Sequence, residues 1–243
     1  MRIAEGIEML ELQVSPTMKI HPTIVYDENG WALADTGMPG SAPAIRELAG
    51  AAGIGKLPLR HIILTHQDID HVGGLPAFLA EEDEMPTVYA HEDDKGAING
   101  TQPMIKVTPE RLAGLLEQLP EAVRVQFEQT FLHPSRPNVE RTIADGETLP
   151  IAGGLTVIHT PGHTPGHVCL YHLPSKTLIA GDAMIVENGE LQGPRPAVTP
   201  DMEQALLSLK KLAAYDIAAV ICYHGGFYQG SANERIAVLA DQP

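Results

Sequence analysis

Short apolar runs alternate with polar, turn-rich segments along most of the chain. Two such runs flank Glu28-Asn29-Gly30, and an Asn-Gly pair between apolar runs is a strong signal for a β-hairpin. Residues 41–53 then show apolar positions at helical spacing, with Ser41 as a candidate N-cap. A short apolar strand, "RHIILTH", follows at residues 60–66 and leads into a second helical segment that includes "GGLPAFLAEE".

The pattern changes between residues 92 and 137, where two helical segments are separated by several prolines. We interpret this region as a helical insertion, or cap, within a single domain that spans residues 1–243. Strand-like runs return after it, and the chain ends with a helix, the strand "IAAVICYH" and a last helix, with Thr199 as the candidate cap of the first. Strands followed by helices in both halves predict an α/β protein with two sheets inside and helices outside.

The composition of the chain limits the classes of molecule that it is expected to bind. The chain has 16 basic and 31 acidic residues, a formal net charge of −15, which disfavours nucleic acid and anionic membranes. No apolar run has the length of a signal peptide or a membrane span, and the two cysteines lie in strand-like runs where we expect reduced thiols. These features predict a cytoplasmic protein that acts on a small molecule; they leave a homodimer open.

The segment "THQDIDHVGG" crowds imidazoles and carboxylates directly after an apolar strand. In an extended chain His66, Asp68 and Asp70 would share one side, and His71 would follow at the turn into the next helix. Such groups around one point are costly to bury unless a cation neutralises them. Imidazole and carboxylate together are typical ligands of hydrolytic zinc, iron or manganese.

Three further polar clusters follow strand-like runs. "HTPGHTPGH" carries His163 and His167 on a loop that its prolines and glycines keep non-helical. Asp182 follows the run "TLIA", and His224 lies in "CYHGG". Four clusters at strand ends are difficult to explain as core structure, so the sequence predicts a metal site.

Together, "ADTG" (34–37), "THQDIDHVGG", "TPGHTPGH", "AGD" and "YHGG" resemble the metallo-β-lactamase superfamily in identity and order. The resemblance implies a four-layer αββα sandwich, classed as α/β or α+β, with a dinuclear site, zinc being preferred over manganese or iron. It implies that His66 and His163 hold the first metal ion, that Asp70, His71 and His224 hold the second, and that Asp182 bridges them. The supporting residues would be Asp35, Thr65, Thr164 and His167.

Asp68 departs from the common family pattern, which has histidine there. In one interpretation, which we favour, Asp68 is a ligand of the first metal ion, and its oxygen shifts the metal preference toward manganese or iron. In the other, its side chain is too short to reach. The protein would then work with a single ion at Asp70, His71 and His224.

The function that the resemblance implies is metal-dependent hydrolysis of a small ester, lactone, thioester or amide. A metal-bound hydroxide would attack the carbonyl, and Asp70 would pass the proton to the leaving group. We rank lactones and esters first. Glutathione thioesters rank lower, because few basic residues other than Arg195 lie near the motifs. The alternatives are a non-haem iron oxidoreductase on the same fold, motivated by Asp68, and a metal-binding protein with a degenerate site.

Overall fold

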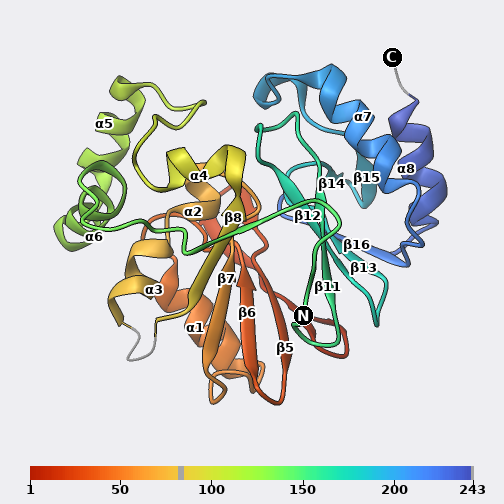
Figure 1. Cartoon of the computed structure of the whole chain (residues 1–243), viewed down its shortest axis with the longest axis horizontal. Coiled ribbons are helices and arrows are strands. Elements are labelled where there is room, and N and C mark those ends of the chain that lie inside the picture. The colour runs from red at the N-terminus through yellow and green to blue at the C-terminus, as the bar shows by residue number, and fades with distance from the viewer. Residues whose placement is uncertain (82–84, 242–243) are drawn as a thin grey trace.

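The computed structural model describes residues 1–81 and 85–241, and within them two β-sheets lie face to face (Figure 1). The first sheet has the spatial order β1-β2-β5-β6-β7-β8-β9. Its strands are β1 (Arg2–Ala4), β2 (Ile7–Met9), β5 (Thr23–Asp27), β6 (Gly30–Ala34), β7 (Leu59–Ile63), β8 (Thr87–His91) and β9 (Arg141–Ile143). Strands β3 (Leu12–Ser15) and β4 (Met18–Ile20) form a separate hairpin beside it.

The second sheet has the order β10-β11-β12-β13-β16-β17. It is built from β10 (Thr148–Leu149), β11 (Leu155–His159), β12 (Val168–His172), β13 (Thr177–Ile179), β16 (Ala219–Cys222) and β17 (Gly226–Tyr228). The hairpin of β14 (Ile185–Glu187) and β15 (Glu190–Gln192) stands apart from it.

Helices cover the outer face of each sheet (Figure 1). Those on the side of the first sheet are α1 (Ala42–Ala51), α2 (Ile69–Val72), α3 (Leu75–Glu81), α4 (Glu92–Ile98), α5 (Pro109–Gln118), α6 (Glu121–Phe127) and a π-helical turn (Glu128–Leu132). Those on the side of the second are a 3₁₀ turn (Pro196–Val198), α7 (Met202–Leu212) and α8 (Ala232–Ala240). The arrangement confirms the predicted αββα sandwich.

Alternation along the strands creates the three apolar layers. In β7, Ile62 packs with the residues under α1 and α3, whereas Ile63 lies between the sheets. In β11, Val157 lies between the sheets and Ile158 packs under α7 and α8. Successive strand residues point to opposite faces, so these runs are apolar throughout because both faces are covered.

Several local predictions can be compared with the structure. The Asn-Gly hairpin is confirmed, since Asp27 pairs with Gly30 at its end. Ser41 occupies the N-cap position of α1, as predicted, although its side chain makes no capping hydrogen bond. The predicted cap of α7 is wrong, because that helix begins at Met202 with Asp201, not Thr199, as its N-cap. Asp201 accepts from the Gln204 N–H at 2.9 Å, a bond that Thr199 is too far upstream to make.

In the described ranges, no helix is long and apolar enough to span a lipid bilayer. The two cysteines, Cys169 and Cys222, are free and buried in the second half of the sandwich, as the sequence predicts.

Candidate metal centre

The segment after β7 delivers four candidate ligands, but its backbone is not extended throughout. Strand β7 ends at Ile63, and α2 begins at Ile69 with Asp68 as its N-terminal flanking residue. The carbonyl of Asp68 accepts from the backbone N–H of His71 and of Val72 at 2.9 and 3.0 Å. The prediction of period-two alternation through Asp70 is therefore wrong, because a helical turn places Asp70 and His71.

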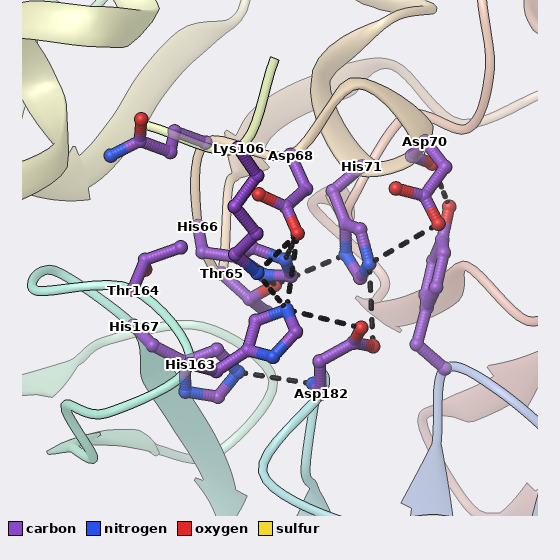
Figure 2. Close-up of polar contacts among 12 residues, drawn as sticks. Thr65, His66, Asp68, Asp70, His71, Lys106, His163, Thr164, His167 and Asp182 are labelled. Atoms are coloured by element: carbon purple, nitrogen blue, oxygen red, sulfur yellow. Dashed lines mark hydrogen bonds and ion pairs between the residues drawn. The ribbon is translucent and has the colours of Figure 1, made fainter. Parts of the chain in front are cut away.

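The second sheet supplies the other candidates. His163 lies on the loop between β11 and β12, Asp182 follows β13, and His224 follows β16. Asp182 is central: its carboxylate oxygens lie 3.4 Å from His71 Nε2 and 3.3 Å from His163 Nε2 (Figure 2). They also lie 3.4 Å from His224 Nε2. His224 Nε2 is also 3.3 Å from Asp70 Oδ2. Residues from both halves of the sequence thus meet at one edge of the sandwich.

The cluster has the donor set and the unsatisfied atoms of a metal site. Four of its buried atoms make no hydrogen bond to described residues: His66 Nε2, His71 Nε2, His163 Nδ1 and Asp182 Oδ1. Orphaned buried polar atoms are costly, and a divalent cation bound at the cluster would satisfy those that face it. The residues form three overlapping groups with ligand atoms within 4.8 Å of one another: His66, Asp68 and His163; His66, His71 and Asp182; Asp70, His71 and His224. The residues present therefore fit a divalent metal ion.

Asp35 orients His71 for this role. Its Oδ2 lies 2.8 Å from His71 Nδ1 and accepts from the Thr65 hydroxyl, while its Oδ1 accepts from the Thr65 N–H. A ring N–H donated to a carboxylate leaves Nε2 as the atom that faces a metal. Asp35 itself has a φ of 63°, a left-handed backbone conformation that is uncommon for residues other than glycine. The hydrogen bonds of its carboxylate hold it in this conformation.

His167 lies behind the cluster, as the sequence resemblance implies for a supporting residue. Its Nε2 accepts from the Asp182 backbone N–H at 3.0 Å, and its Nδ1 is 2.8 Å from the Thr160 hydroxyl. Burial lowers the pKa of His167 well below its ordinary value, so the ring stays neutral. Gly181 permits this contact, because a Cβ there would lie 2.7 Å from His167 Nε2.

Thr164 supports the site indirectly, through a residue that the sequence analysis missed. Its hydroxyl donates to Asp94 at 2.7 Å. Asp94, fully buried at the start of α4, also accepts from the backbone and side-chain amides of Gln67 and from the Gly166 N–H, at 2.9 to 3.0 Å. One carboxylate therefore ties the loop of His66 to the loop of His163.

Tyr223 is a second residue that the sequence analysis missed. Its ring lies 3.7 Å from the ring of His71, with an angle of 31° between the planes. Its hydroxyl donates to the carbonyl of Asp70. The residue next to His224 therefore packs one candidate ligand and fixes the backbone of another. Its position beside "HGG" is the only signal in the sequence.

The carboxylates and imidazoles of the cluster shift one another's pKa values. Burial disfavours the imidazolium form of His224, but the Asp182 and Asp70 carboxylates outweigh it and raise the pKa of His224 to about 9. The pKa of His71 is raised well above its ordinary value despite burial, by Asp35, Asp182 and Asp70. Burial likewise opposes ionisation of Asp182, yet His71 and His224 hold its pKa well below the usual range. Without a metal ion, protons are therefore held at His71 and His224, two of the histidines that a metal ion would bind.

Lys106 and Arg111 were also missed, since few basic residues other than Arg195 were expected near the motifs. Both line a cavity of about 390 Å³ with Asp68 and Asp70. Its wall also includes Ile69, Val107 and the segment 196–200. Lys106 Nζ lies 2.6 Å from Asp68 Oδ2 and 2.6 Å from His163 Nε2 (Figure 2). These basic residues lie within residues 92–137, the region interpreted from the sequence as a helical insertion, where no motif marks them.

Comparison with known proteins agrees with this geometry. A family model described as the metallo-beta-lactamase superfamily matches residues 19–224. The chain is 32% identical over 234 residues to the "Probable metallo-hydrolase YflN" of Bacillus subtilis (strain 168), covering 91% of this chain and 84% of that protein.

Two more relatives indicate the range of the similarity. A hydroxyacylglutathione hydrolase of Xylella fastidiosa (strain M12) is 29% identical over 84% of this chain and 62% of its own length. The crystal structure of a metallo-beta-lactamase family protein, TTHA1429 from Thermus thermophilus, has a TM-score of 0.72 and 25% identity, over 98% of this chain and 79% of that chain.

Proposed function

Because the chain belongs to the metallo-β-lactamase superfamily, we propose that it is a metal-dependent hydrolase of small esters and lactones. The observation that carries the proposal is the cluster of Asp70, His71, Asp182 and His224 beside the 390 Å³ cavity. A cavity of this size takes a small molecule. When bound at this cluster, a divalent metal would supply an activated water molecule and polarise a carbonyl.

The roles of the protein groups follow from their positions. Asp70 both belongs to the cluster and lines the cavity, and its side chain is 24% exposed. Burial opposes its ionisation, but His71 and His224 keep its pKa below the ordinary value, so it is a carboxylate at neutral pH. It can orient a water molecule, accept its proton and pass that proton to the leaving group. Ile69, Val107 and Ala197 give the cavity apolar walls for an acyl chain or lactone ring.

A second candidate substrate class is a thioester that carries an anionic group. Arg111 lines the cavity and can pair with a carboxylate, and one relative is named a hydroxyacylglutathione hydrolase. This corrects the sequence argument against such substrates, because the basic residues come from the insertion.

The experiment is a hydrolysis assay with p-nitrophenyl acetate, a γ-lactone and an S-acylglutathione, on protein treated with EDTA and then supplied with zinc, manganese or iron(II). We expect metal-dependent turnover of the ester or lactone that drops at least about 100-fold in Asp182→Ala and His71→Ala. His133→Ala, outside the cluster, is the control. Turnover of the thioester alone would favour the second substrate class. If none of the three substrates is hydrolysed, the result would contradict the proposed hydrolase and favour a metal-binding protein with a degenerate site.

A further inference from the structure

Lys106 contacts the group of candidate ligands to which the sequence resemblance assigns the first metal ion. The group formed by His66, Asp68 and His163 has its ligand atoms within 4.8 Å of one another. The Lys106 ammonium lies 2.6 Å from two of them, Asp68 Oδ2 and His163 Nε2, which are themselves 3.1 Å apart (Figure 2). An ammonium can donate to both, and the short distance to Asp68 is that of a charge-assisted hydrogen bond.

The backbone around Lys106 is anchored. The N–H of the preceding residue, Ile105, donates to the side-chain oxygen of Gln67 at 2.9 Å. Gln67 in turn donates to Asp94 through both its backbone N–H and its side-chain amide. The Lys106 side chain is only 16% exposed. Its position is therefore fixed by the same buried carboxylate that joins the two ligand loops.

We infer that Lys106 is the resident cation on this side of the site, so that the protein binds one divalent metal ion, at Asp70, His71, Asp182 and His224, instead of two. The inference rests on the proposed function for the presence of that ion. It also accounts for Asp68. The carboxylate of Asp68 neutralises the charge of the Lys106 ammonium, which the neutral imidazole of a histidine at position 68 could not do. The aspartate at position 68 and the lysine at position 106 are therefore explained together, as an ion pair.

The charges of the site agree with this assignment. Asp68, Asp70 and Asp182 supply three negative charges. One divalent ion and the Lys106 ammonium supply three positive charges, which balance these three carboxylates; the further carboxylate of Asp35 is paired with His71. A second divalent ion would have to displace the ammonium or bind beside it. Two cations bound side by side repel each other.

The test is the number of metal ions bound per chain. Wild-type protein and the variants Lys106→Met, Lys106→Arg and Lys95→Met are treated with EDTA, equilibrated with excess zinc or manganese, passed over a desalting column and analysed for metal. Lys106→Met removes the charge and keeps the length of the side chain. Lys106→Arg keeps the charge. Lys95→Met removes a partly exposed lysine that pairs with Glu92.

We expect about one ion per chain in the wild type, Lys106→Arg and Lys95→Met, and about two in Lys106→Met, with the second ion bound at least about tenfold more tightly than in the wild type. Circular dichroism of each variant checks that it is folded. Two ions in the wild type, or one in a folded Lys106→Met, would overturn the inference. Because the readout is metal content, these counts stand whether or not any substrate is hydrolysed, and a wild type that binds no metal would overturn the proposed function as well.

Discussion

At the scale of single residues, Asp94 is the main structural support of the candidate site. It is fully buried and accepts four hydrogen bonds that join the loops of His66 and His163. Asp94→Ala would leave the N–H groups of Gln67 and Gly166 buried without an acceptor, at about 1–3 kcal/mol for each group. We expect the free energy of unfolding to fall by about 3 kcal/mol or more, measured by urea denaturation of the metal-free protein.

The neighbouring residue provides the control. Asp93 is 55% exposed and, among the residues that the structure describes, forms an ion pair with His91 alone, so Asp93→Ala should change stability by about 0.5 kcal/mol or less. Equal losses in the two variants would show that the Asp94 bonds do not hold the loops.

The raised pKa of His224 predicts proton release on metal binding. With its pKa at about 9, the metal-free ring carries a proton at pH 7 that zinc must displace. Zinc binding should therefore release about one proton or more at pH 7, and apparent affinity should rise as the pH increases toward 9. Calorimetry in two buffers of different ionisation enthalpy measures the number released. The number should fall as the pH approaches 9, and release close to zero at pH 7 would refute the assignment.

At the scale of elements, the helices and strands that could be predicted are those whose sequence pattern lies within the element itself. The Asn-Gly hairpin, β7 and the helices around α5 and α6 were expected, because turn chemistry and periodicity lie within each segment. Strands β1 to β4 and the β14–β15 hairpin were not recognised, because each has only three or four residues and lacks a clear period. The support from Asp94 and Lys106 was missed for another reason: their partners at the site lie 27 to 72 residues away, and only the fold brings them together.

Helix α5 allows a test of how much backbone entropy within one helix contributes to the stability of the protein. Gly114 lies in its interior with ordinary helical φ, and a Cβ there would meet nothing within 4 Å. Gly114→Ala should stabilise the protein by about 0.5–1 kcal/mol, because alanine loses less backbone entropy than glycine in a helix.

Gly73, at the end of α2, is the matched opposite. A Cβ there would lie 2.4 Å from Pro39 Cδ and 2.5 Å from the Ile69 carbonyl oxygen, so Gly73→Ala should lower the melting temperature that Gly114→Ala raises. A decrease in both would mean that α5 is constrained in a way the packing does not show.

At the scale of the whole molecule, the candidate ligands divide between the two halves of the sandwich. Asp70 and His71 follow the first sheet, whereas Asp182 and His224 follow strands of the second. A metal ion bound by all four would link the halves, and unfolding would have to separate its ligands. Binding to the native state alone stabilises a protein by about 2.7 kcal/mol when the free ligand is 100 times its Kd.

Adding zinc to EDTA-treated protein should therefore raise its melting temperature, and chelation should reverse the increase. The zinc-induced shift should disappear in both His71→Ala and His224→Ala, which remove one ligand from each half, and persist in Lys95→Ala. Comparing the shift within each variant separates metal linkage from any stability that the substitution itself removes. Loss of the shift in only one of the two histidine variants would place the metal within a single half of the molecule and exclude a site shared by the two sheets.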